Sequence, residues 1–161
     1  MFGEVIGNVC FVRNDGKVLL LQRDREPMKG RWTGVGGKIK FHEEPLESCI
    51  REVKEETGLD VDPELAGIIA SINRSTLSKW FLFVYVASSR KEELGRCHEG
   101  TLEWVDEKEL HTKDLALIKV SLPYILGRKK KDIIIDKIVH DGKKVLSCTL
   151  REGRKILLEI P

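Results

Sequence analysis

The chain has 161 residues, of which 41% are hydrophobic and 34% are charged, with a net charge of +2. This length suits one domain with a sizeable core, and this composition excludes an intrinsically disordered chain. No apolar run approaches the roughly 20 residues of a membrane helix, and the first residues lack the pattern of a secretory signal, so we expect a cytoplasmic protein that does not enter a membrane.

The first third of the sequence predicts a β-hairpin and a loop. Val5–Arg13 alternates between two faces and Lys17–Arg23 is mostly apolar, with the turn residues Asn14–Gly16 between them. Asp24–Thr33 contains a proline and glycine and predicts a loop. Gly34–Lys40 is rich in glycine and is expected to lead into a short strand.

The clearest helix is predicted between Pro45 and Gly58. Proline is favoured in the first helical turn, and glycine is favoured just past the last one. Four positions recur at helical spacing and predict one buried stripe, made of Leu46, Ile50, Val53 and Thr57.

A strand pair, a further strand and two helices are predicted next. Trp80–Val86 is apolar throughout, which predicts a central strand covered on both faces. The predicted elements, in chain order, are the strands Leu65–Ile72, Lys79–Ala87 and Gly100–Val105 and the helices Asp106–Leu110 and Leu115–Leu126.

The last part of the chain predicts a β-meander with a basic surface. Its three β-like runs are Ile133–Val139, Val145–Leu150 and Lys155–Ile160. Residues 128–161 hold ten basic and five acidic residues, which could attract polyanions or form a solvated basic face. We predict a domain over residues 1–127 and a basic, β-rich extension over 128–161 packed on it. The irregular mixture of helices and strands indicates an α+β fold, a mixed α/β/α sandwich.

Cysteines and histidines do not predict a site. The cysteines form no CxxC pair, and their long spacings favour buried, reduced thiols over a zinc site or disulfides. The four histidines are scattered, and we expect none to be catalytic. No interleaving of aromatic and basic residues predicts specific nucleic-acid binding.

Three glutamates of the predicted helix are the candidate metal-binding residues. Glu52, Glu55 and Glu56 fall within an arc of roughly 100°. Their mutual repulsion, worsened by the helix dipole, would be relieved by a divalent cation such as Mg²⁺ or Mn²⁺. A solvated acidic face is the alternative. We expect the side chains of Glu52 and Glu56 to face solvent.

The residues around these glutamates favour the metal interpretation. Gly36 and Gly37 would let the backbone approach a ligand, and a carbonyl could join the metal ligands. Glu43 stands at the helix entrance and can support the helix or the metal site. The planar fork of Arg51 can pin a carboxylate with two hydrogen bonds.

The spacing G-x5-E-x7-R-E-U-x-E-E-x-G-U, with U aliphatic, runs from Gly37 to Leu59 and resembles the Nudix box at every specified position. The resemblance extends to the Val5–Arg23 hairpin, Trp32–Lys38 and His98–Val105. These segments are similar to MutT-like Nudix enzymes that cleave nucleoside triphosphates, including the oxidised-purine (8-oxo-dGTP) group. The resemblance implies a Nudix fold with a central mixed sheet, the box helix and a C-terminal helix.

The resemblance also implies roles for individual residues. The implied catalytic residues are Arg51, Glu52, Glu55, Glu56 and Glu99. The implied metal ligands are Gly37, Glu52, Glu55, Glu56 and Glu99. The implied substrate-binding residues are Arg23, Lys38 and Trp32. The alternatives are an ordinary loop glutamate for Glu99, surface charges for Arg23 and Lys38, and a wall or core aromatic for Trp32.

The implied activity is Mg²⁺-dependent hydrolysis of a nucleoside triphosphate to a nucleoside monophosphate and pyrophosphate. The expected partner is a small-molecule nucleotide, and the expected form is a monomer or homodimer. ADP-ribose, nucleotide sugars and dinucleoside polyphosphates remain alternative substrates, although Arg74–Ser78 lacks the proline and tyrosine typical of two of those groups. A non-catalytic nucleotide sensor is the further alternative. Leu115–Lys119 lacks the aspartate pair that reads oxidised purines in the best-known such enzyme, which predicts modest base discrimination.

Overall fold

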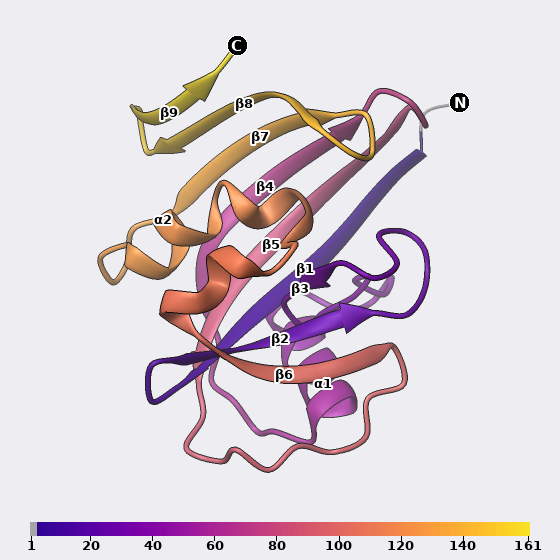
Figure 1. Ribbon diagram of the computed structural model, residues 1–161, viewed down its shortest axis with the longest axis vertical. Coiled ribbons are helices and arrows are strands. Elements are labelled where there is room, and N and C mark those ends of the chain that lie inside the picture. Colours follow the sequence, from indigo (N-terminus) through magenta and orange to yellow (C-terminus); the bar gives the residue numbers. More distant parts are fainter. Residues whose placement is uncertain (1–2) are drawn as a thin grey trace.

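The computed structural model describes residues 3–161, which form a nine-stranded mixed sheet with helical elements on its two faces (Figure 1). The strands are β1 (Gly3–Asn14), β2 (Lys17–Arg23), β3 (Trp32–Thr33), β4 (Glu64–Asn73), β5 (Ser78–Ser88), β6 (Gly100–Asp106), β7 (Ile134–His140), β8 (Val145–Glu152) and β9 (Lys155–Ile160). The helices are α1 (Pro45–Thr57), the short 3-10 helices η1 (Glu107–Thr112) and η2 (Ala116–Lys119), and α2 (Leu122–Gly127). The mixed sheet and the few helices confirm the predicted α+β class with C-terminal strands.

The sheet opens between β1 and β2, and this opening positions the candidate site. The strand order is β3-β2-β1-β5-β4-β7-β8-β9, and β6 pairs with β2. β1 runs parallel to β5 over its whole length, whereas β2 pairs with β1 only next to the hairpin turn, at Arg13↔Val18 and Asn14↔Lys17. Beyond that point the glycine-rich segment lies beside β1, bridging it at Cys10↔Val35 and Gly7↔Lys38.

The alternation along β1 divides the core between the two faces of the sheet. Val9 and Phe11 belong to the cluster that packs on η2 and α2. Cys10 and Val12 belong to the cluster that packs on α1. This arrangement is the predicted sandwich. Within residues 3–161, no helix has the length and apolarity needed to cross a membrane.

Several predicted elements differ in detail. Trp32–Thr33 is a short strand, not a loop, and Gly34–Lys40 makes isolated bridges in place of the predicted short strand. The predicted helix Leu115–Leu126 is divided into the 3-10 helix η2 and the short helix α2. Ala116, where η2 begins, adopts a φ of 52°, so a regular α-helix cannot run from Leu115 through this position. The predicted helix Asp106–Leu110 is the 3-10 helix η1. β5 is central as predicted, but its first half is only partly covered.

The buried face of α1 is also rotated from the predicted stripe. Val53 and Thr57 are buried as expected, but Ile50 is 42% exposed. The buried residues of the helix are Ser48, Cys49, Val53, Glu56 and Thr57. The helix therefore turns a serine and a glutamate toward the sheet, where the apolar periodicity predicted Leu46 and Ile50.

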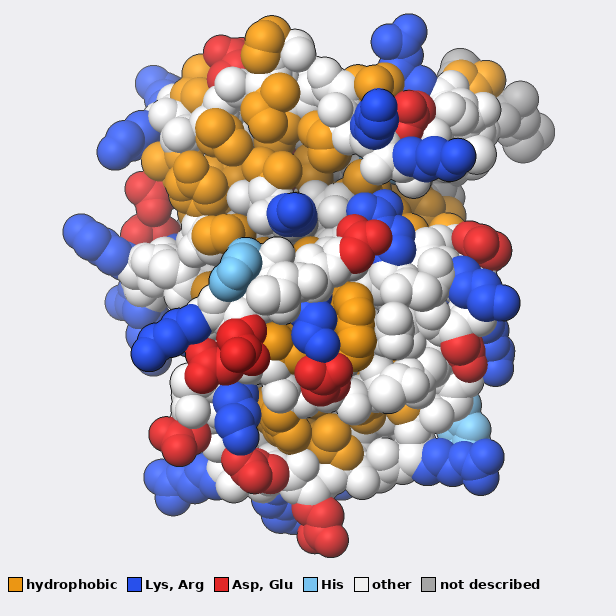
Figure 2. Space-filling view, viewed as in Figure 1, with side chains coloured by type: hydrophobic (Ala, Val, Ile, Leu, Met, Phe, Trp, Pro, Cys, Tyr) orange, Lys and Arg blue, Asp and Glu red, His pale blue; other side chains and the backbone are white. Residues whose placement is uncertain are grey.

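The C-terminal strands extend the sheet through β4. β7 runs parallel to β4 from Gly67↔Ile134 to Asn73↔His140, and β7, β8 and β9 form the predicted antiparallel meander. Hydrophobic side chains gather on the surface near this end of the molecule (Figure 2). The exposed large hydrophobic residues of these three strands are Ile135, Leu146, Ile156 and Ile160.

Candidate metal and nucleotide site

Local capping fixes both ends of the helix that carries the candidate site. Glu44 precedes α1 and accepts hydrogen bonds from the backbone amides of Leu46 and Glu47, while the Glu47 side chain accepts one from the Glu44 amide. This reciprocal pattern is a capping box, which satisfies amides that a helix start leaves free. At the other end, the Gly58 amide donates to the Lys54 carbonyl. Local sequence therefore determines where α1 begins and ends, and so where the site glutamates lie within the helix.

The glycine-rich segment approaches β1 more closely than side chains would allow. The Asn8 amide donates to the Gly37 carbonyl at 2.9 Å. A Cβ on Gly36 would lie 2.2 Å from the Asn8 carbonyl oxygen, so no larger residue fits there. The segment thus lies between β1 and α1, with the Gly37 carbonyl bonded to β1 and the Gly36 amide directed at Glu56 of the helix.

Glu56 is the buried carboxylate of the site. Glu56 is only 5% exposed, and its Oε2 accepts a hydrogen bond from the Gly36 amide at 3.1 Å. Its Oε1 is buried without a partner. Burial, together with the negative charges of Glu99 and Glu52, raises the pKa of Glu56 to about 8. The expectation that Glu56 faces solvent is wrong, because the helix turns it toward the glycine segment.

Glu52 lies one turn before Glu56 and against Gly37. A Cβ on Gly37 would come within 2.7 Å of Glu52 Oε1, so the glycine makes room for this carboxylate. The Glu52 side chain is 15% exposed, which contradicts the expectation that it faces solvent. Burial raises the pKa of Glu52, and the neighbouring Arg51 opposes that rise.

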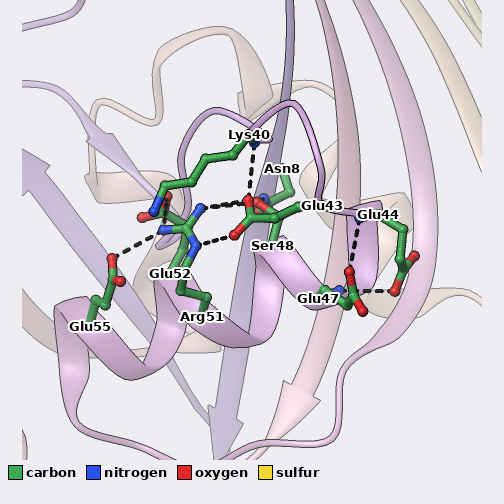
Figure 3. A network of polar contacts seen from close by, with 9 residues as sticks. All are labelled: Asn8, Lys40, Glu43, Glu44, Glu47, Ser48, Arg51, Glu52 and Glu55. Atoms are coloured by element: carbon green, nitrogen blue, oxygen red, sulfur yellow. Dashed lines mark hydrogen bonds and ion pairs between the residues drawn. The ribbon is translucent and has the colours of Figure 1, made fainter.

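Arg51 connects the carboxylates along the helix (Figure 3). Its guanidinium holds Glu43 through two hydrogen bonds and donates to Glu52 Oε1 at 2.8 Å and to Glu55 Oε2 at 3.1 Å. The Glu43 hydrogen bonds raise the pKa of Arg51, and the same contact lowers the pKa of Glu43 to about 2. The expected hydrogen bond from Arg51 to a carboxylate is therefore present, and it holds Glu52 in place.

Glu55 and Glu99 border the buried pair. The Glu55 side chain is 57% exposed and bends toward Arg51. Glu99 lies in the loop before β6, with a 44% exposed side chain 3.7 Å from Arg23. Its negative charge helps to raise the pKa of Glu56, which places Glu99 near the same cluster. The structure thus brings the predicted glutamates to one place, around the backbone of Gly36 and Gly37.

The donor set fits a hard divalent cation. Within residues 3–161, no three acidic, histidine or cysteine side chains are already arranged as a complete metal site. Arg51 accounts for part of this, because it occupies an oxygen of Glu52 and draws Glu55 away. The unpartnered Oε1 of Glu56, beside two further carboxylates, is nevertheless an oxygen that a cation would satisfy.

The predicted substrate-binding residues have different surroundings. Arg23 donates to the Pro27 carbonyl and lies beside Glu99, so it borders the carboxylate cluster. The Lys38 ammonium is 6.0 Å from the centre of the Trp80 ring. Trp32 is half-buried and packs against the core, which agrees with its alternative role as a wall aromatic.

The sequence did not identify three residues that border these groups. The Lys113 ammonium lies 4.3 Å from the centre of the Trp32 ring and also pairs with Glu103. Asn8 and Ser48 form a buried hydrogen bond beside Arg51. Asn8 could have been noticed as a polar residue in an otherwise apolar strand, but nothing local distinguishes Lys113 from other surface lysines.

Comparison with protein families gives a match over most of the chain. The model of the NUDIX domain matches residues 2–123. The uncharacterized Nudix hydrolase YvcI of Bacillus subtilis is 35% identical over 112 residues, which cover 66% of this chain and 69% of that protein. The 8-oxo-dGDP phosphatase NUDT18 of Danio rerio is 30% identical over 106 residues, covering 62% of this chain but only 30% of that protein.

A solved structure shows the same fold. The crystal structure of the MutT protein from Bacillus halodurans superposes with a TM-score of 0.76 and 32% identity, covering 91% of this chain and 97% of that one. Because this superposition covers 91% of the chain, it includes residues beyond position 123, where the family match ends.

Proposed function

This chain belongs to the Nudix family of hydrolases, and we propose that it hydrolyses nucleoside triphosphates, oxidised ones among them, to a nucleoside monophosphate and pyrophosphate. The observation that carries the proposal is the buried Glu56, with one free oxygen, between Glu52, Glu99 and the glycine backbone. Such a cluster would hold a cation that neutralises the charge of a phosphate chain. Similarity to an 8-oxo-dGDP phosphatase supports oxidised purine nucleotides, and the triphosphate rests on the similarity to a MutT protein.

Nudix hydrolases generally use divalent metal ions, and Mg²⁺ is the cofactor we propose, with Mn²⁺ as a substitute. Glu52 and Glu56 would be its principal ligands, helped by Glu55, Glu99 and the Gly37 backbone. The ion supplies neutralisation of the phosphate oxygens and activation of a water molecule. Glu56 would bind it as the carboxylate, so its proton must leave when the ion enters.

The remaining side chains would orient the substrate and move one proton. Arg51 keeps Glu52 in place through the hydrogen bond at 2.8 Å. Glu99, whose side chain is 44% exposed and lies near Glu56, is our candidate to take the proton from the attacking water. Arg23 and Lys38 would contact phosphate oxygens, and Trp32 would form a wall beside the nucleoside. The placement of fixed charges is then the main contribution of the protein.

Outside the chemistry, we propose a cytoplasmic protein that acts on small-molecule nucleotides without specific nucleic-acid recognition, as a monomer or homodimer. Residues 1–127 would form the hydrolase domain, and 128–161 would be an extension packed on it. Light scattering of the purified chain would give the oligomeric state.

A nucleotide panel tests the proposal. The purified protein is incubated with Mg²⁺ and (deoxy)nucleoside triphosphates, their 8-oxo forms, nucleoside diphosphates, ADP-ribose and dinucleoside polyphosphates, and the products are separated by chromatography. We expect pyrophosphate, not orthophosphate, from several triphosphates, with one base preferred. Hydrolysis in ¹⁸O-labelled water locates the attacked phosphorus. Activity confined to diphosphates or ADP-ribose would refute the triphosphate proposal, and no activity on the panel would favour a nucleotide sensor.

A further inference from the structure

A buried polar pair joins β1 to the helix that carries the candidate site. Asn8 is 3% exposed and Ser48 is fully buried. The Asn8 amide nitrogen Nδ2 donates to Ser48 Oγ at 2.9 Å, across forty residues of sequence. Both residues stand where an apolar side chain would be the simpler choice, since Asn8 is flanked by core residues of β1 and Ser48 faces the sheet.

Asn8 also holds the glycine segment on the other side. Its backbone amide donates to the Gly37 carbonyl at 2.9 Å, and its carbonyl lies against Gly36. One residue therefore contacts both halves of the candidate site, the glycine backbone through its main chain and α1 through its side chain. A shift of Asn8 would move these halves relative to each other.

Ser48 extends the connection to the arginine and its carboxylates (Figure 3). Its Oγ lies 3.4 Å from Arg51 Nη2. The pKa of Glu43 is lowered chiefly by Arg51 and, to a smaller extent, by a hydrogen bond from Ser48. A serine hydroxyl can accept two hydrogen bonds and donate one, so Ser48 can serve Asn8, Arg51 and Glu43 together. The chain of contacts then runs from β1 through Ser48 and Arg51 to Glu52.

The Asn8–Ser48 pair stabilises the core less well than two apolar side chains could. Asn8 Oδ1 is buried without a partner. An unsatisfied buried polar atom lowers stability, whereas replacing both members of a buried polar pair by apolar groups can be nearly neutral. A stabilising role alone therefore does not account for the pair.

We propose that Asn8 and Ser48 are positioning residues of the metal site. They hold β1, the glycine segment and α1 in the one arrangement that brings the Gly37 backbone, Glu52 and Glu56 together. Neither residue reaches the reacting atoms. The inference rests on the proposed metal-dependent hydrolysis, but it concerns the geometry of the ligands and can be tested by metal binding alone.

The double variant Asn8→Val with Ser48→Ala separates positioning from stability. Valine suits a strand, alanine suits a helix, and together they leave no orphaned polar atom of the pair. We expect thermal unfolding of the metal-free double variant close to that of the wild type. We expect its Mn²⁺ affinity, measured by electron paramagnetic resonance, to fall about 10- to 100-fold, the effect typical of losing a group that orients metal ligands.

A second buried pair provides the matched control. Ser71 Oγ and the Nε2 atom of His140 are 2.9 Å apart, join β4 to β7 and lie outside the carboxylate cluster. Ser71→Ala should lower the unfolding temperature without changing Mn²⁺ affinity. If the double variant does not fold, Ser48→Ala alone serves, with the same expected loss of affinity.

Wild-type Mn²⁺ affinity in the double variant, or in Ser48→Ala if that is the variant used, would overturn the proposal, and so would an equal loss in Ser71→Ala. A wild-type protein that binds Mn²⁺ but hydrolyses no nucleotide would overturn the proposed function alone, because the affinity comparison would still decide the role of the pair. A wild-type protein that binds no Mn²⁺ would overturn both.

Discussion

The Gly36 amide and the Glu56 carboxylate, twenty residues apart in sequence, form a hydrogen bond of 3.1 Å. This contact lies on the buried face of α1, which is rotated from the predicted apolar stripe. The helix turns Glu56 inward, where the Gly36 amide donates to one carboxylate oxygen and the other oxygen has no partner. The predictions below follow from this buried acid and the groups that hold it.

Removing either inner carboxylate should abolish most of the activity. Glu52→Gln and Glu56→Gln keep size and polarity but each lose an anionic ligand, so we expect turnover of the preferred triphosphate to fall about 100-fold or more. Glu47→Gln is the matched control, because glutamine also completes a capping box and Glu47 lies at the far end of α1. Near-native turnover of either inner variant at saturating Mg²⁺ would remove that glutamate from the metal site.

The metal-free protein should lose stability as the pH rises. Burial raises the pKa of Glu56 to about 8 from its ordinary value of 4.5, so between these values the folded state binds more protons than the unfolded state. The free energy of unfolding must then fall with rising pH across that interval. Glu56→Gln should flatten this slope, and Mg²⁺ should stabilise the wild type most at the alkaline end. Urea unfolding in chelator at about pH 5 and about pH 8 measures the slope. An equal dependence of the unfolding free energy on pH in the wild type and in Glu56→Gln would contradict the prediction.

A methyl group on Gly37 should displace Glu52. The Cβ of Gly37→Ala would lie 2.7 Å from Glu52 Oε1, a distance that forces the carboxylate to move. We expect activity and Mn²⁺ affinity to fall about tenfold or more while the fold is retained. Gly127→Ala is the control, since no atom lies within 4 Å of its added Cβ. Equal activity of the two variants would show that Glu52 can bind metal from another position.

Arg51→Lys should lower activity although the charge is kept. A lysine ammonium cannot hold Glu43 with two parallel hydrogen bonds and also reach Glu52 and Glu55, as the guanidinium does. We expect a loss of about 10- to 100-fold in kcat. Lys54→Arg, a charge-conserving change at an exposed residue of the same helix, should have no effect. An unchanged rate for Arg51→Lys would make Arg51 an ordinary surface charge.

Truncation after Gly127 should make the protein insoluble or unfolded. The removed segment supplies Ile134, Ile138 and Leu150 to the core, and each is at most 2% exposed. Truncation after Glu152 removes only β9 and leaves those residues in place, so that variant should stay soluble. Light scattering and circular dichroism distinguish the outcomes. A soluble, fully active chain ending at Gly127 would show that the extension is dispensable.

Local signals predicted most of the elements, and tertiary contacts decided the rest. The ends of α1 were predictable because its proline, capping residues and terminal glycine lie within the helix or next to it. The position of β7 beside β4 was not, because strand pairing across more than sixty residues leaves no trace in periodicity. The positive φ of Ala116 was equally hidden, since alanine favours helices in isolation.

The candidate site shows the same division. Motif spacing predicted that Glu52, Glu55, Glu56 and Arg51 lie on one helix, and the structure places Glu99 near them. The same periodicity assigned Glu56 to solvent, because its partner at Gly36 is a backbone group that no side-chain pattern reveals. Sequence periodicity does not reveal the contact of Asn8 either, since its hydrogen bond to Ser48 joins two distant segments.

The parallel pairing of β7 with β4 has a consequence for synthesis on the ribosome. β4 pairs with β5 early in the chain, but its other edge finds its partner only when residues 134–140 have emerged. Until then the nascent chain presents an uncovered strand edge, the feature through which partly made chains associate with one another. We therefore expect ribosome-bound chains that end before β7 to recruit chaperones more strongly than the finished protein, which selective ribosome profiling would show.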